Sequence, residues 1–149
     1  MPYPQRKSPR MKGYNYSSPA SYFITICTHQ KRCIFGQPSQ LNSWGCIAAQ
    51  NIEAISVYSP GVVVEKYVVM PNHVHMLISK VDESSLPSII GTYKASVTKA
   101  IRRTHPEAEV WQRSYHDHII HTETVWEQIW HYIAANPVQW ETDCFYQPA

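Results

Sequence analysis

Apolar and polar residues alternate along the chain with two different periods, and each period predicts a type of element. Residues 21–28 are mostly β-branched or aromatic, which predicts a first strand. Residues 61–70 and 73–81 are apolar runs on either side of a Pro-Asn pair, which predicts two antiparallel strands joined by a tight turn. We expect a fourth strand over residues 110–120 and a turn over residues 36–39.

Three other segments repeat their apolar residues at helical spacing. The first predicted helix covers residues 41–59 and ends before Pro60. The second begins near Ser85 and ends before Pro106, and the third runs from Glu123 to about residue 135, where Asn136-Pro137 ends it.

The predicted order of elements is β-α-β-β-α-β followed by one more helix. This is the split βαβ, or ferredoxin-like, arrangement of the α+β class, with a four-stranded antiparallel sheet and helices on one face. No internal repeat divides the chain, and its 149 residues fit one domain over residues 1–149. Residues 1–20 form a basic leader ahead of the first strand.

Composition narrows the class of protein. With 44% hydrophobic and 16% charged residues, the chain is typical of a globular protein, and no apolar run approaches the roughly 20 residues of a membrane span. The N-terminus lacks the apolar segment of a secretory signal, so we expect a soluble, cytoplasmic protein. The four cysteines show no CxxC spacing, which excludes a zinc ribbon and a redox dithiol motif.

Positive charge is unevenly distributed. No Asp or Glu precedes Glu53, and a second basic cluster lies in the second predicted helix. Segregated positive charge favours contact with a phosphate backbone, although a solvated tail and a solvated helix face would look the same. The candidate contacts in the leader are Arg6, Lys7, Arg10 and Lys12, and those in the helix are Lys94, Lys99, Arg102 and Arg103.

His73 and His75 are the first candidate chemical site. The period of two in a strand places both on one face and sends Val74 and Met76 to the other, into a core. Two imidazoles on one face of a rigid strand can share a divalent metal ion. The alternative is that both are polar residues on a half-solvated strand face.

Tyr132 and Asn136 are the second candidate site. They lie one turn apart on the same side of the third helix, beside its apolar stripe. The alternative is that Tyr132 lies at the edge of the core and that Asn136 caps a helix before a proline.

Five stretches together resemble the REP-associated tyrosine transposases. This family belongs to the single-tyrosine, His-hydrophobe-His (HUH) nuclease superfamily and is related to the insertion-sequence transposases. The similarity runs in order from about residue 6 to residue 146. It is carried by residues 10–16, 22–28, 69–75, 111–120 and 132–137.

The resemblance implies cleavage and rejoining of single-stranded DNA near hairpin-forming repeats. It implies a divalent ion, Mg²⁺ or Mn²⁺, bound by His73 and His75 and completed by Asn136. Tyr132, on the added C-terminal helix, is then the catalytic nucleophile, which forms a 5′-phosphotyrosine and releases a 3′-hydroxyl. The resemblance also favours a monomer whose site is completed in cis, as against a dimer with shared sites.

A second His-x-His, His116 and His118, is an alternative metal pair on a predicted strand. The resemblance instead gives His118, with Arg113, a supporting role beside the metal site or a contact with DNA. Asp117, between the two histidines, is expected to be a surface carboxylate.

Two other functions remain open on the sequence. One is a non-catalytic ferredoxin-like module that binds structured single-stranded nucleic acid. The other is a metallohydrolase that uses water in place of Tyr132. The sequence does not identify the DNA target.

Overall fold

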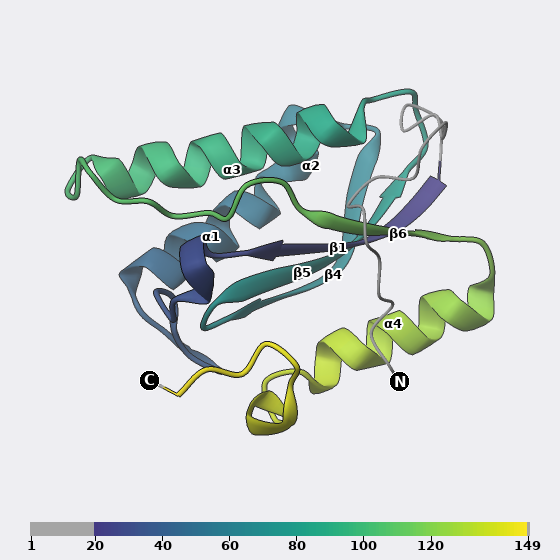
Figure 1. The fold of residues 1–149 in the computed structure, drawn as a ribbon. Coiled ribbons are helices and arrows are strands. Elements are labelled where there is room, and N and C mark those ends of the chain that lie inside the picture. Colours follow the sequence, from purple (N-terminus) through teal and green to yellow (C-terminus); the bar gives the residue numbers. More distant parts are fainter. Residues whose placement is uncertain (1–19, 149) are drawn as a thin grey trace.

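A four-stranded antiparallel sheet forms the centre of the molecule, with strand order β4-β5-β1-β6 (Figure 1). It is seen in a computed structural model that describes residues 20–148. The predicted ferredoxin-like α+β sheet is confirmed. The leader candidates Arg6, Lys7, Arg10 and Lys12 lie outside the described residues. The strands are β1 (Ala20–Cys27), β4 (Val62–Met70), β5 (His73–Lys80) and β6 (His116–Ile120). A small hairpin of β2 (Gly36–Gln37) and β3 (Gln40–Leu41) follows the short helix η1 (His29–Lys31).

The predicted helices are confirmed, and a side chain caps the N-terminus of each. Asn42, Ser85 and Thr122 accept hydrogen bonds from the backbone N–H three residues later in α1, α3 and α4. The first predicted helix is divided at Ala54 into two parts. The helices are α1 (Ser43–Glu53), α2 (Ile55–Tyr58), α3 (Leu86–Arg102), α4 (Glu123–Ala135) and the short η2 (Trp140–Thr142). Within residues 20–148, no helix has the length and apolarity that a membrane span requires.

The helices cover both faces of the sheet. Those of the βαββαβ unit lie on one face, as predicted, and the added C-terminal helix, for which the sequence predicted no face, lies on the other. Helices α1, α2 and α3 lie on one side and α4 lies on the other (Figure 1). The reason is that the second face also carries apolar side chains. Phe23 and Leu77 on that face form a separate buried cluster with Ile129 and Ile133 of α4.

The fourth strand is shorter than predicted. It begins at His116, and residues 108–115, here called the connecting segment, are mostly irregular. Ser114 has a φ of 69°, which interrupts extended pairing. The Lys94 ammonium donates to the backbone carbonyls of Gln112 and Ser114, so the segment is fastened to α3 by hydrogen bonds other than sheet pairing.

Asp117 is not the surface carboxylate that the sequence predicted. Its residue is only 2% exposed. In the sheet register Asp117 lies opposite Ile24, whose side chain belongs to the main core on the α3 side. Strand alternation therefore turns His116 and His118 to the α4 side and Asp117 to the core side.

Candidate active site

His73 and His75 lie side by side on the face of β5 that α4 covers. Both side chains are fully buried. Their ring centroids are 4.7 Å apart, with the rings nearly perpendicular. The predicted placement of the two imidazoles on one face, with Val74 and Met76 in the opposite core, is confirmed.

Asn72 fixes the orientation of His73. The Nδ2 amide of Asn72 donates to the carbonyls of Phe145 (2.8 Å) and Lys31 (3.2 Å), so its Oδ1 is the atom that faces the histidine. His73 Nδ1 donates to that Oδ1 at 2.8 Å. The neutral ring therefore carries its proton on Nδ1, and the lone pair of Nε2 is available for a metal ion.

Thr25 has the matching position beside His75. It lies on β1 directly opposite His75 in the sheet register. A buried hydrogen bond of 2.9 Å joins Thr25 Oγ1 to His75 Nδ1. Nε2 of His75 is thus the nitrogen that would bind an ion, as in His73.

Tyr132 and Asn136 approach this pair from α4. The ring of Tyr132 lies 5.6 Å from that of His75, centroid to centroid, and its edge packs against Phe23. Asn136 is buried, and its side chain is close enough to influence the pKa of both His73 and Tyr132. One helical turn thus brings a phenol and an amide to the two imidazoles.

Burial sets the protonation of the site. It lowers the pKa of His73 to about 3, against a smaller opposite contribution from Asn136, and it lowers the pKa of His75 well below its usual range. Both rings are therefore neutral at neutral pH, as metal ligands must be. Burial, followed by the nearby Asp143 carboxylate, raises the pKa of Tyr132 to about 12, which keeps the phenol protonated.

Residues 140–147, here called the C-terminal segment, cover the histidines. The Phe145 ring stacks on His73 with a centroid distance of 4.5 Å, and Trp140 lies 6.2 Å from the same ring. These contacts account for the complete burial of His73. In this structure the segment therefore separates His73 from solvent.

The donor set is suited to a divalent ion. The described part of the chain contains no cluster of three or more His, Cys, Asp and Glu side chains that could hold a metal ion, so a third ligand drawn from these residues would be of another type. Nε2 of His73 and Oδ1 of Asn136 are both buried and have no hydrogen-bond partner within residues 20–148. Two imidazoles and an amide oxygen would leave coordination positions for phosphate oxygens and water.

The other candidate residues occupy two places. His116 and His118 lie on the same face of the sheet as His73 and His75, but two strands away, because β1 separates β6 from β5. Arg113 and Lys99 are exposed and line a groove on the α3 side. The ammonium of Lys94 borders the same groove and is bonded to the connecting segment.

Sequence reasoning gave no role to Asn72, Thr25, Trp140 or Phe145. Asn72 stands next to His73, so adjacency was the available signal. Thr25 reaches His75 only because β1 pairs with β5. Phe145 lies 73 residues after Asn72, whose side-chain amide donates to its carbonyl. Neither relation has a local sequence signal.

Comparison with known proteins gives a consistent result. The family model for IS200-like transposases matches residues 17–136. An uncharacterised protein of Haemophilus influenzae is 38% identical over 167 residues, covering 95% of this chain and 93% of its own length. A REP-associated tyrosine transposase bound to a REP hairpin has a similar fold, with a TM-score of 0.67 and 18% identity, covering 90% of this chain and 74% of that one.

Proposed function

Because this chain belongs to the IS200-like transposase family, we propose that it cuts and rejoins single-stranded DNA beside hairpin-forming repeats. Membership of the family makes it a DNA-processing enzyme. The finer proposal, a metal-dependent reaction through a phosphotyrosine, rests on the residues of the site.

The observation that carries the proposal is the meeting of four side chains on one face of the sheet. His73 and His75 present neutral imidazoles, and α4 brings Tyr132 and Asn136 to them. A structural tyrosine at the edge of a core would not need two buried imidazoles beside it. A buried pair of histidines with one nitrogen each tied by Asn72 and Thr25 is typical of metal ligands.

The proposed reaction is a transesterification in which Tyr132 Oη attacks a DNA phosphorus in line. A bond from phosphorus to the tyrosine oxygen forms, and the bond from phosphorus to the 3′-oxygen breaks. The phenol loses one proton and the leaving 3′-oxygen gains one, so no net acid or base is consumed. The 5′-phosphotyrosine keeps the energy of the phosphodiester, and a different 3′-hydroxyl can attack it in reverse.

His73, His75 and Asn136 would hold the divalent ion, Mg²⁺ or Mn²⁺. When bound, such an ion supplies positive charge that polarises the scissile phosphate and favours the phenolate of the nucleophile. The protein's own contribution is positional, because Asn72 and Thr25 hold the imidazoles and α4 holds Tyr132. Phe23 packs against the Tyr132 ring, and Phe145 packs against the His73 ring.

The proposed DNA partner follows from the related fold. The solved REP-associated transposase holds a REP hairpin, and we extend hairpin recognition to this chain. Cleavage would then occur in the unpaired DNA next to the stem.

The test is covalent capture of the nucleophile. The full chain is incubated with Mn²⁺ and a labelled oligonucleotide that carries a hairpin and an unpaired flank. We expect a protein–DNA adduct that survives denaturation and is lost in Tyr132→Phe. Tyr58→Phe is the matched control, because Tyr58 is exposed on α2 and loses the same hydroxyl.

Each alternative gives a different result in this assay. Cleaved DNA without an adduct would indicate water as the nucleophile and contradict the role of Tyr132. Tight hairpin binding with no cleavage under either ion would indicate a non-catalytic binding module. An adduct that persists in Tyr132→Phe would mean that another residue attacks.

A further inference from the structure

A groove of about 820 Å³ lies between α3 and the connecting segment, on the side of the molecule away from α4. One wall carries Lys99, Arg102 and Arg103 of α3, and the other carries Arg113. Four exposed cationic side chains therefore face a single hollow, against one acidic side chain, Glu109.

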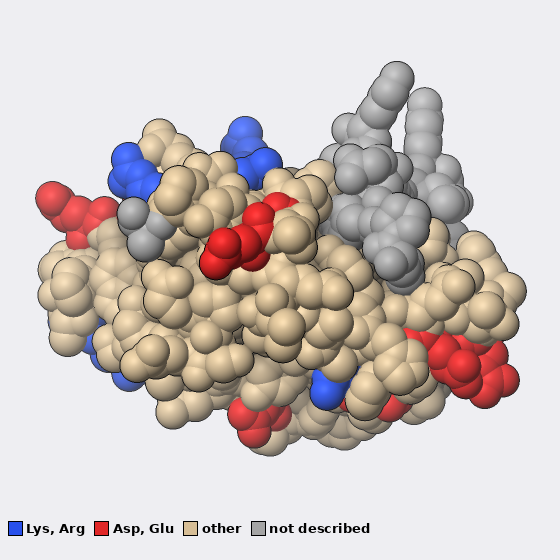
Figure 2. Space-filling model, turned by 90° about the horizontal axis from the view of Figure 1, so that it is seen from below, with Lys and Arg blue, Asp and Glu red and all other residues tan. Residues whose placement is uncertain are grey.

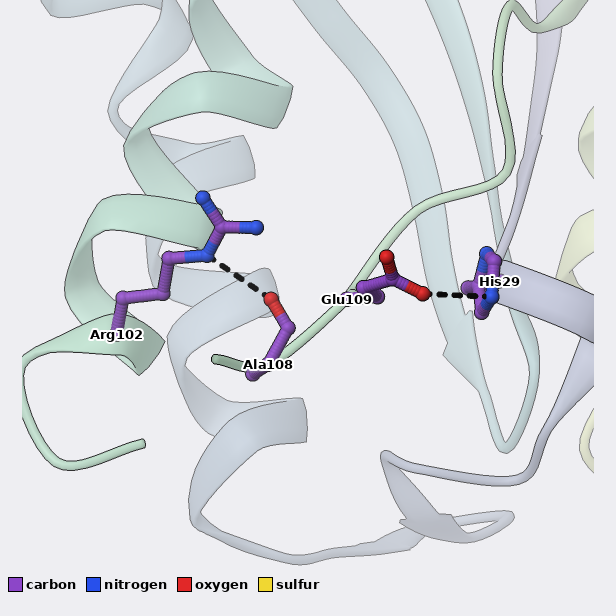
Figure 3. Close-up of polar contacts among 4 residues, drawn as sticks. All are labelled: His29, Arg102, Ala108 and Glu109. Atoms are coloured by element: carbon purple, nitrogen blue, oxygen red, sulfur yellow. Dashed lines mark hydrogen bonds and ion pairs between the residues drawn. The ribbon is translucent and has the colours of Figure 1, made fainter. Parts of the chain in front are cut away.

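The positive groups are arranged along the groove. Lys99 is three and four residues before Arg102 and Arg103, so the three side chains share one face of α3. Arg102 Nε donates to the Ala108 carbonyl at 2.9 Å, which orients the guanidinium at the groove wall and leaves its terminal nitrogens for a ligand (Figure 3). The Glu109 carboxylate is turned to His29, 2.9 Å away, at the start of η1 (Figure 3).

The lining favours phosphate groups over unpaired bases. Single strands are usually gripped by stacking of bases on exposed aromatic rings. Two aromatic rings line this groove among the described residues, those of His29 and Trp111. Trp111 packs between Phe35 and Tyr93 and donates its Nε1–H to the Lys94 carbonyl, and His29 is paired with the Glu109 carboxylate, so both rings are already in contact with other groups of the protein.

The α4 side of the molecule differs in its charge. Figure 2 views this face, and outside the grey atoms its basic side chains are few and separated by uncharged and acidic ones. Among the described residues, the groove beside α3 therefore offers phosphate groups a denser set of positive side chains than the α4 side does.

The groove also lies close to the candidate active site. The connecting segment bonds to the end of β1, through Gln112 N to the Cys27 carbonyl and His29 N to the Val110 carbonyl. Cys27 pairs on its other side with His73. Two strand spacings, roughly 10 Å, separate this groove wall from His73. A smaller cavity of about 230 Å³, lined by Cys27, Arg113 and His116, shares the lining residues Gln112 and Arg113 with the groove.

We propose that this groove binds the sugar-phosphate backbone of the double-stranded hairpin stem and directs the unpaired flank past Arg113 toward Tyr132. This inference rests on the proposed function, which supplies the hairpin. It assigns the stem and the unpaired strand to different surfaces, the first recognised by charge and the second by the site under α4.

The test measures binding by fluorescence anisotropy with two DNA probes, a fully paired hairpin without a flank and an unstructured single strand. Loss of one phosphate contact at 0.1 M salt reduces affinity about eightfold and lowers the slope of log K against log salt by about one. We expect these changes for the hairpin in Lys99→Gln and in Arg103→Gln. Glu109→Gln removes the negative charge from the groove and should tighten hairpin binding.

Lys66→Gln is the matched control, because it makes the same change of charge on β4, on the α4 side. Hairpin affinity that is unchanged in the groove variants, or reduced equally by Lys66→Gln, would overturn the inference. Equal losses for the hairpin and the single strand would also overturn it, since the groove would then not distinguish a stem.

The two proposals fail separately. If Tyr132 forms an adduct but the groove variants bind the hairpin as the wild type does, the role of the groove is contradicted and the proposed function stands. Hairpin binding that depends on the groove residues, without any adduct, would contradict the proposed function and leave the groove as a binding surface.

Discussion

His73 and His75 each use Nδ1 for a hydrogen bond within the protein, and this choice decides which nitrogen can bind an ion. For His73 the partner is an amide that is itself fixed by two carbonyls. For His75 it is the hydroxyl of Thr25 on the neighbouring strand. The supporting residues thus set the direction of each lone pair, and they should affect metal affinity without touching the metal.

Thr25→Val removes the hydroxyl beside His75 and keeps the shape of the side chain. We expect Mn²⁺ affinity to fall by about 10- to 100-fold, because the imidazole loses the bond that orients it. Isothermal titration calorimetry measures the change. Ser21→Ala is the control, since it breaks a hydroxyl pair with Ser79 across the same two strands, away from the histidines. Equal affinity in Thr25→Val and the wild type would contradict this role.

Acid should destabilise the metal-free protein through the same two rings. Burial lowers the pKa of His73 to about 3 and that of His75 in the same direction, whereas in the unfolded chain both titrate near 6.5. Below pH 6.5 the unfolded state therefore binds more protons, and stability falls with pH. Between pH 7.5 and 5.5 the loss is about 1.4 kcal/mol for each histidine.

Urea unfolding at the two pH values measures this loss. The variant His73→Gln should show about half of the wild-type pH dependence, because it removes one of the two buried rings. An identical pH dependence in the variant would show that other groups are responsible.

At the scale of elements, the C-terminal segment isolates the site. The ring of Phe145 covers His73, and the backbone carbonyl of Phe145 accepts a hydrogen bond from the Asn72 amide. The segment is thus packed onto the site and hydrogen-bonded to Asn72, which orients His73, one of the proposed metal ligands.

Phe145→Ala should expose the histidines. We expect faster modification of His73 by diethyl pyrocarbonate, read by mass spectrometry of the peptide that contains it, because the stacked ring is gone. Val138→Ala serves as the control, since Val138 is 89% exposed between α4 and the segment. If His73 stays as unreactive in Phe145→Ala as in the wild type, another group covers it.

The helices and strands could be predicted because their signals are local. The capping residue Ser85, the turn at Pro71-Asn72 and the spacing of Tyr132 and Asn136 each act within a few residues. The side of the sheet that α4 covers depends on Phe23 and Leu77, which the sequence separates by more than fifty positions. The burial of Asp117 likewise depends on the pairing of its strand with β1. Its neighbours in the sequence, His116 and His118, are polar and gave no sign of that burial.

At the scale of the whole molecule, one chain contains the complete candidate site. Tyr132 lies beside His75 of the same chain, and Asn136 lies near His73. A site completed in cis stays a prediction, and this arrangement within one chain is the one that it requires.

Mixing two inactive variants tests this arrangement. Tyr132→Phe lacks the nucleophile, and His75→Ala lacks a metal ligand. In a cis site neither can repair the other, so the mixture should form no adduct with hairpin DNA. An adduct in the mixture, at a level that rises with protein concentration, would indicate a dimer that exchanges its tyrosine helices.

The placement of α4 across the sheet has a consequence for the time at which the enzyme becomes active. The histidines are made early and Tyr132 is made late, and the chain between them takes roughly 3–12 s to synthesise at about 5–20 residues per second. Residue 132 comes only twelve residues after the end of β6, so the last strand and the tyrosine helix become available to fold at nearly the same time. Under the proposed function, a chain that stops before residue 132 has every strand of the sheet but no attacking hydroxyl, and we expect it to form no phosphotyrosine.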